Sequence, residues 1–136
     1  AAEELLNKEN VICLPHLGAS TPEAEDNCAV MAVNQLRDFL ENGNIVNSVN
    51  FPKTVNENPI PAGGTRICIA HKNVPDVISK FSKILGEAKL NISGMINQAK
   101  GELAYNVMDV DGVVSEETLR ALANIDTVIK VRPIFG

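Results

Sequence analysis

The sequence predicts an α+β fold, with a β-α-β-β-α-β unit preceded by a strand, a loop and a long helix. From Arg66 onward, segments of strand-like apolar alternation are interleaved with segments whose apolar residues recur every three or four positions. A stretch rich in proline and glycine separates this unit from the residues before it. The 136 residues suffice for one small domain plus a fragment of another.

The first part of the chain predicts one strand and one long helix. The apolar run of residues 10–14 is typical of a buried strand, which ends at Pro15. Ser20 and Glu23 have the spacing of a capping box, and Gly43 stands where a helix C-cap is expected. One strand and one helix cannot bury each other's apolar faces, so we expect residues 1–46 to be a fragment of a larger α/β domain.

Residues 47–65 lack apolar periodicity and contain three prolines and two glycines (NSVNFPKTVNENPIPAGGT). Such a composition is typical of an exposed linker. We therefore predict a linker at 47–65 and a second domain at 66–136.

The second domain begins with the alternating strand RICIA, and Ser115 is placed to cap its second helix, with two glutamates in the first turn. The predicted strands are 66–70, 91–99, 103–110 and 127–134, with helices at about 77–88 and from 116. This is the ferredoxin-like split βαβ order. It predicts a four-stranded antiparallel sheet with both helices on one face, leaving the other face and the edges for a partner.

Composition argues against several classes of function. The net charge is -5 and the basic residues are scattered, which opposes nucleic acid as a partner. The three cysteines form neither a CxxC pair nor a Cys/His ligand group, so we predict no metal site and reduced thiols. No apolar run approaches the ~18 residues of a membrane helix, and we expect a cytoplasmic protein with no membrane partner.

His16 stands at the end of the first predicted strand, where ligands gather in α/β folds. It could serve as a general acid/base for a carbonyl/alcohol interconversion, or it could merely hydrogen-bond its own loop. Gly18 and Ala19 would let a flat cofactor ring approach, but small residues are equally common in any tight turn. Both interpretations stay open.

His71, Asn73 and Asn91 lie at strand ends in the second domain. A zwitterionic amino acid needs donors for its carboxylate and acceptors for its ammonium group, and these side chains offer both. The two asparagines could equally cap a helix and a turn. The sequence contains no GxGxxG, Walker, GxSxG or HExxH motif, so no self-contained nucleotide or hydrolytic site is expected.

The segment HLGASTPEAEDN resembles the catalytic loop of the D-2-hydroxyacid dehydrogenase family, and residues 66–136 resemble an ACT domain, with HKNVP and Asn91-Ile92 similar to a serine-binding signature. The first resemblance implies that His16 donates and accepts the substrate proton. It also places His16, Leu17, Gly18 and Ala19 beside the nicotinamide of NAD. The second implies that His71, Asn73 and Asn91 bind L-serine as an effector.

Together the two resemblances imply the carboxyl-terminal part of an enzyme that oxidises 3-phosphoglycerate to 3-phosphohydroxypyruvate with NAD, in L-serine biosynthesis. The family's dinucleotide fingerprint, partner carboxylate and substrate arginine would lie upstream of Ala1, so we expect no turnover by this chain alone. The ACT resemblance implies a homodimer, or a tetramer if two dimers join.

One departure from the ACT pattern is Asp76 after Pro75, where many ACT domains have glycine. It leaves the identity of the effector open. The alternatives are a stand-alone amino-acid-binding module and an oligomerisation module without a catalytic role.

Overall fold

The computed structural model describes residues 2–5 and 8–136, and the chain divides into two compact units, residues 1–34 and 35–136. Helix α1 (Ala2–Leu5) lies in the first unit. Helix α2 (Pro22–Asn42) begins in the first unit and ends in the second. The division therefore falls inside the long helix, and the last turns of α2 belong with the unit that follows.

The long helix is present, but two predictions about the first unit are wrong. Residues 10–14 form no strand and are exposed, because no strand among the described residues of this unit lies beside them to complete a ladder. The helix cap is Thr21 and not Ser20, since the Ala24 amide donates to Thr21 Oγ1 at 3.2 Å.

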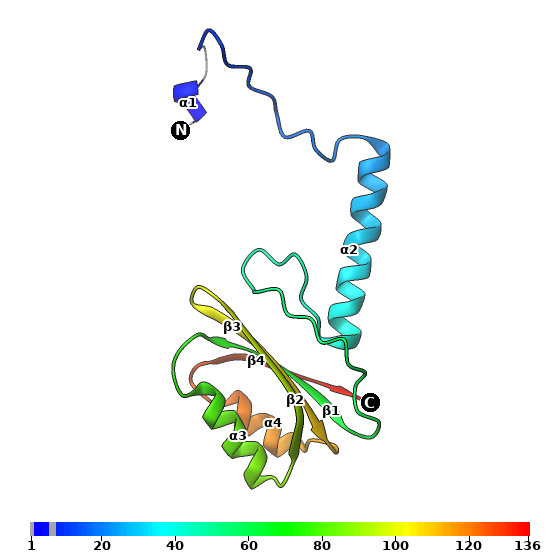
Figure 1. Ribbon diagram of the computed structural model, residues 1–136, viewed down its shortest axis with the longest axis vertical. Helices are drawn as coiled ribbons and strands as arrows, with labels where there is room; N and C mark the ends of the chain where they lie inside the picture. The colour runs from blue at the N-terminus through cyan, green and yellow to red at the C-terminus, as the bar shows by residue number, and fades with distance from the viewer. Residues whose placement is uncertain (1, 6–7) are drawn as a thin grey trace. The chain divides into compact units, whose positions relative to one another are not determined.

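The second unit has the predicted β-α-β-β-α-β order. Its strands are β1 (Thr65–Lys72), β2 (Asn91–Lys100), β3 (Leu103–Asp111) and β4 (Val128–Phe135), and its helices are α3 (Val77–Glu87) and α4 (Glu116–Ala123). All pairings are antiparallel, in the sheet order β2-β3-β1-β4 (Figure 1). The ferredoxin-like prediction is confirmed, and β2 and β4 are the edge strands.

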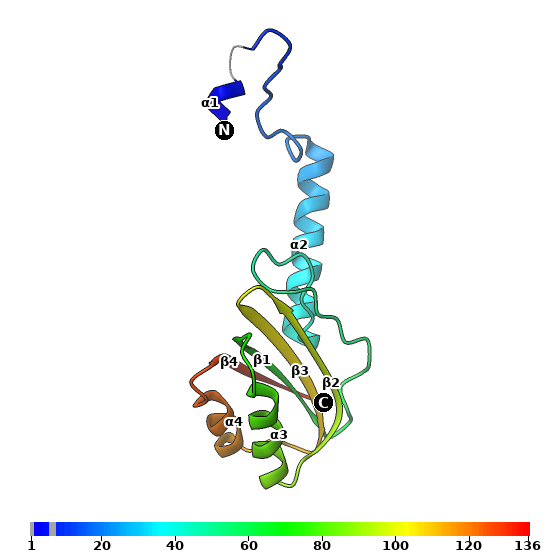
Figure 2. The same cartoon turned by 60° about the vertical axis from the view of Figure 1, so that its left-hand side comes forward.

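Both helices lie on one face of the sheet (Figure 2). Alternate residues of the central strands point toward them, so that the apolar side chains of sheet and helices form one buried cluster. Its members include Ile67 and Ile69 of β1, Phe81 of α3, Met108 of β3 and Leu122 of α4, all with 0% of their surface exposed. The Ser115 cap is confirmed, because its side chain accepts from the Thr118 amide.

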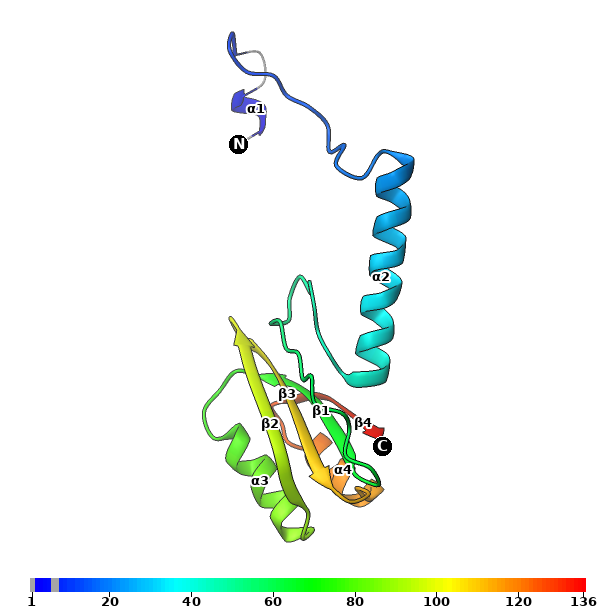
Figure 3. The ribbon, with the colours of Figure 1, turned by 45° about the vertical axis from the view of Figure 1, so that its right-hand side comes forward.

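The opposite face of the sheet is covered in part by the chain itself, contrary to the prediction that it stays free. After α2, Ile45 forms an antiparallel bridge with Thr54, and the segment runs along this face (Figure 3). Ile45 joins Tyr105 and Val107 in a second apolar cluster. Thr54 and Asn56 are only 1% and 5% exposed. The stretch predicted as an exposed linker is therefore partly a packing element.

A buried ion pair fastens this segment to the sheet. Arg66 of β1 contacts Asp109 of β3 through two nitrogens, Nε to Oδ1 at 2.6 Å and Nη2 to Oδ2 at 2.8 Å. Arg66 also donates to the carbonyl oxygens of Asn42 and Asn58, and Asn56 donates to Asp109. One guanidinium thus joins the end of α2, the segment after it and two strands.

The carboxyl end of α2 is held by side chains from the sheet. Tyr105 donates its hydroxyl to the Gly43 carbonyl at 2.9 Å, and Arg132 donates to the carbonyls of Phe39 and Leu40. The Arg132 guanidinium also lies over the Phe39 ring, 4.5 Å from its centroid. Cations and hydroxyl donors stabilise the unpaired carbonyls at a helix carboxyl end.

Helix α3 ends in a Schellman motif whose left-handed position is a lysine. The Leu90 amide donates to the Leu85 carbonyl and the Lys89 amide to that of Gly86, while Lys89 has a φ of 57°. We expect Lys89→Gly to raise the free energy of unfolding by about 1 kcal/mol, because glycine adopts this conformation without strain. Lys83→Gly inside α3 should lower it by a similar amount, about 1 kcal/mol. Urea unfolding of both variants measures the two signs.

Candidate functional site

His71 is the penultimate residue of β1 and Asn73 is the first residue after it, beside the turn between β2 and β3. The Asn73 amide donates to the Glu102 carbonyl at 2.9 Å, and its side chain donates to that of Gly101 at 3.0 Å. Asn73 is exposed, and its contacts hold the β1–α3 loop against the hairpin turn. The structure thus brings these two predicted residues together.

His71 is buried, although its predicted role in effector binding would need an accessible side chain. Only 2% of its surface is exposed, and its ring packs edge-on against Phe81 with centroids 5.4 Å apart. Its Nδ1 lies 2.8 Å from the Lys72 carbonyl oxygen and its Nε2 lies 3.0 Å from Asn97 Oδ1. Both ring nitrogens therefore have protein partners in the single chain.

Two asparagines that the sequence analysis did not single out complete a polar cluster around His71. Asn97 of β2 and Asn106 of β3 are paired in the sheet register, and Asn106 Nδ2 lies 3.4 Å from Asn97 Oδ1. Asn106 is 0% exposed and its Oδ1 has no hydrogen-bond partner. The sequence did contain a signal for this cluster, because Asn106 is a polar residue at an inward position of the largely apolar strand LAYNVMDV.

Asn91 lies at the other end of the sheet. It opens β2, pairs in register with Asp111 and donates to the Asp111 carboxylate at 2.7 Å. Ala104 of β3 pairs with His71 on one side and with Ala99 on the other, so His71 is level with Ala99, near the other end of β2. At about 3.3 Å per residue, Asn91 and His71 are on the order of 25 Å apart. A single chain therefore does not bring Asn91 to the other two residues.

Asp76, the departure from the ACT pattern, occupies the N-cap of α3 with a φ of 69°. This is the left-handed region, which favours glycine. Its side chain caps no helix amide, but Ser79 Oγ donates to both its carboxylate and its carbonyl oxygen. The backbone thus has the conformation for which glycine is suited, with a negative charge added at the helix start.

The residues predicted beside a nicotinamide form an open loop. His16, Leu17, Gly18 and Ala19 are all exposed, and nothing lies within 4 Å of a Cβ built on Gly18. The Ser20 amide closes the turn by donating to the Leu17 carbonyl at 3.1 Å. A flat ring could lie against this loop, but no wall encloses it. The loop by itself does not fit a dinucleotide, and the role of His16 stays a prediction.

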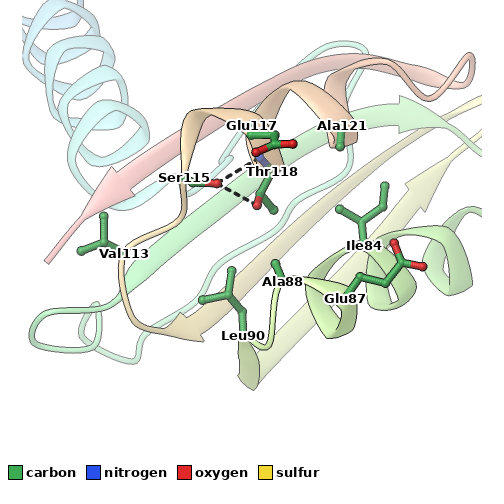
Figure 4. Close-up of a pocket in the computed structure, with 9 residues that line it drawn as sticks. All are labelled: Ile84, Glu87, Ala88, Leu90, Val113, Ser115, Glu117, Thr118 and Ala121. Atoms are coloured by element: carbon green, nitrogen blue, oxygen red, sulfur yellow. Dashed lines mark hydrogen bonds between the residues drawn. The ribbon is translucent and has the colours of Figure 1, made fainter.

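The second unit also has hollows on both faces of its sheet. One, of about 450 Å³, opens between α3 and α4, where Glu87 and Glu117 stand at the rim of a floor formed by residues such as Ile84 and Leu90 (Figure 4). Another, of about 370 Å³, is almost wholly apolar and lies on the opposite sheet face, beside Cys68. Burial raises the pKa of the Cys68 thiol, so this cysteine is not an activated nucleophile.

Among the residues that the structure describes, no cluster of three or more histidine, cysteine, aspartate or glutamate side chains could hold a metal ion. In the same residues, no helix is long and apolar enough to cross a bilayer.

Comparison with known proteins gives a consistent set of relatives. The chain is 33% identical over 130 residues to the D-3-phosphoglycerate dehydrogenase of Escherichia coli K12, a match covering 93% of the chain and 31% of that protein. It is 30% identical over 132 residues to the enzyme of that name from Dictyostelium discoideum, covering 97% of the chain and 31% of that protein. The chain thus spans about a third of the length of these relatives, as a carboxyl-terminal fragment would.

No family model matches the chain. Among solved structures, the regulatory subunit of aspartate kinase from Thermus thermophilus aligns with a TM-score of 0.45 and 14% identity, over 59% of this chain and 56% of that one. The sequence relatives confirm the resemblance to dehydrogenases that was predicted from HLGAST and HKNVP.

Proposed function

We propose that this chain is the carboxyl-terminal regulatory part of an NAD-dependent D-3-phosphoglycerate dehydrogenase, and that its sheet unit is an ACT domain that binds L-serine as a feedback effector. In this proposal residues 1–46 belong to the catalytic and NAD-binding domains, 47–65 connect them to the regulatory domain, and 66–136 form that domain. The names of the relatives support the activity. The positions of Asn73 and Asn91 support the regulatory role.

The observation that carries the proposal is that Asn91 opens the edge strand β2, whereas Asn73 lies against the turn that follows the other end of that strand. Among the described strands, β2 pairs with β3 alone, so its outer backbone groups are free to pair with another strand. If two copies join through antiparallel β2 strands, a two-fold axis passes near the middle of the strand. Asn91 of one copy then lies at the same end of the joined sheet as the partner's Asn73 and His71, which completes two equivalent sites per dimer.

The chemistry of such a shared site suits a zwitterionic ligand. Asn73 and Asn91 are exposed and offer amide N–H groups to a carboxylate and amide oxygens to an ammonium or hydroxyl group. The Asp111 carboxylate beside Asn91 adds a charged acceptor. Because binding needs both copies, the effector stabilises one arrangement of the two domains over others, which is how it would alter a distant active site.

In the whole enzyme, His16 would pass the proton between solvent and the substrate oxygen as 3-phosphoglycerate becomes 3-phosphohydroxypyruvate. NAD, when bound by the complete enzyme, accepts the hydride. The loop 16–19 would lie beside the nicotinamide, while the other groups that bind NAD and substrate are not recognisable in this sequence. We therefore expect no turnover by this chain alone, and a cytosolic location for the enzyme.

Titration calorimetry of L-serine into this chain tests the proposal, with glycine, L-alanine and D-serine as competing ligands. We expect saturable heat that is selective for L-serine and is lost in Asn91→Ala. The exposed Asn124 of α4 supplies the control Asn124→Ala, which should bind as the unmodified chain does. A folded dimer that gives no heat with any of the four amino acids would refute effector binding and leave an assembly module, since strand pairing needs no ligand.

A further inference from the structure

The polar cluster of His71, Asn97 and Asn106 poses a hydrogen-bonding problem. Both nitrogens of the His71 ring face oxygen atoms, the Lys72 carbonyl at 2.8 Å and Asn97 Oδ1 at 3.0 Å. A neutral imidazole carries one N–H and can satisfy only one of these oxygens. With the amides in these orientations, the cluster therefore requires an imidazolium.

A charged imidazolium is energetically unfavourable at this buried position. His71 is 2% exposed, its ring packs edge-on against Phe81, and no carboxylate is among its contacts in the described residues. Burying an unpaired charge costs far more than burying a neutral hydrogen-bonded ring. The same orientations also leave Asn106 Oδ1 buried without a donor.

Rotating both asparagine amides by a half turn removes the conflict at His71, because the two ends of an amide have nearly the same shape. The Asn97 amide nitrogen then donates one hydrogen to His71 Nε2 and the other toward Asn106 Oδ1. His71 keeps its hydrogen on Nδ1 and donates it to the Lys72 carbonyl. Neutral His71 satisfies both of its nitrogens in this arrangement.

The rotation has a consequence at the surface. Asn97 is an exposed residue of the edge strand β2, and the far end of its amide has no hydrogen-bond partner among the described protein groups. After rotation, that end is the carbonyl oxygen. An acceptor then stands at the edge of the strand where a second copy of the chain would pair.

We propose that Asn97 is a further residue of the effector site, which holds His71 in the Nδ1–H tautomer and accepts a hydrogen bond from the ammonium group of the bound amino acid. The inference rests on the proposed effector function, and it assigns His71 a positioning role that acts through Asn97. This contact would make the site selective for an amino acid over the corresponding hydroxy acid, because a hydroxyl group is a weaker hydrogen-bond donor than an ammonium group.

The tautomer is measured without any ligand, by long-range ¹H–¹⁵N correlation spectra of the histidine rings. The chain has only 2 histidines, and His16→Gln assigns the signals. We expect His71 to be protonated on Nδ1 near neutral pH and to lose this single tautomer in Asn97→Leu. A ring protonated on Nε2, or on both nitrogens, in the unmodified chain would overturn the proposed arrangement.

The ammonium contact is measured by calorimetry with L-serine and L-glycerate, in which a hydroxyl replaces the ammonium group. We expect Asn97→Leu to weaken L-serine binding at least about tenfold and to reduce the preference for serine over glycerate. Asn97→Asp, which keeps an acceptor but loses the donor to His71, should retain that preference. Gln98→Ala, on the neighbouring exposed residue of β2, is the matched control and should bind both ligands normally.

Unchanged serine affinity in Asn97→Leu, or an equal loss for both ligands, would overturn the ammonium contact while leaving the regulatory function intact. Asp111 is a charged acceptor near the shared site, so a preference lost only in Asp111→Asn would also contradict the contact with Asn97. If the unmodified chain binds no amino acid, the proposed function fails together with the contact. The tautomer spectra then still decide whether Asn97 holds His71.

Discussion

Replacing Asp109 by asparagine is expected to lower the free energy of unfolding by about 3–5 kcal/mol, because it breaks a buried ion pair at one partner. The Arg66 and Asp109 side chains are only 1% and 6% exposed. The variant leaves the guanidinium buried without a counter-charge. Its amide nitrogen, moreover, would face donors from Arg66 or Asn56. Urea unfolding followed by circular dichroism measures the loss.

Two controls separate this effect from a general intolerance of charge changes. Arg120→Gln removes the exposed i,i+4 pair with Glu116, in which both side chains are more than three-quarters accessible, and should change stability by no more than about 0.5 kcal/mol. The double variant Arg66→Met/Asp109→Leu removes both buried charges and should recover about half of the loss or more. A loss below about 1 kcal/mol in Asp109→Asn would contradict the burial of this pair.

Replacing Gly43 by alanine is expected to cost about 2–4 kcal/mol, from two causes that act at the same residue. Gly43 follows α2 with a φ of 78°, where alanine is strained. A Cβ at this position would also overlap the Cys68 sulfur, and the Tyr105 hydroxyl oxygen lies 3.7 Å away. The close approach lets Tyr105 reach the Gly43 carbonyl, so the substitution should also loosen the end of α2.

Gly63 provides the matched control, since its φ is 69° and nothing lies within 4 Å of a Cβ built on it. Gly63→Ala should therefore show the conformational cost alone, about 1 kcal/mol. The double variant Gly43→Ala/Cys68→Ala removes the overlapping sulfur and should recover part of the loss. Equal losses in Gly43→Ala and Gly63→Ala, by thermal and urea unfolding, would show that the contact with Cys68 is unimportant.

The elements of the second unit were predicted within one or two residues, because side chains in its strands and helices alternate between core and solvent in the periods that the backbone imposes. The packing of residues 45–56 was not predicted. Proline and glycine reveal the absence of regular structure, but they say nothing about burial. Arg66 was likewise taken as part of an apolar strand, since its partner Asp109 lies 43 positions along the chain.

In the first unit, by contrast, burial was predicted where the structure shows exposed residues. The apolar run at 10–14 has the composition of a buried strand, yet composition cannot supply the neighbouring strand that a ladder requires. At the candidate site, His71, Asn73 and Asn91 were identified from their position at strand ends. Their separation within one chain follows from the strand directions: β1 and β2 both pair antiparallel with β3 and so run parallel, which places the end of β1 far from the start of β2.

The most direct test of the account is a complementation experiment on the shared effector site. Asn73→Ala and Asn91→Ala chains are unfolded together, refolded as a mixture and titrated with L-serine. Each variant alone should bind no serine, whereas hybrid dimers contain one site with both asparagines, so the mixture should recover about a quarter of the unmodified sites. A mixture that binds no more serine than the separate variants, or an Asn91→Ala chain that binds serine by itself, would contradict a site shared between two copies.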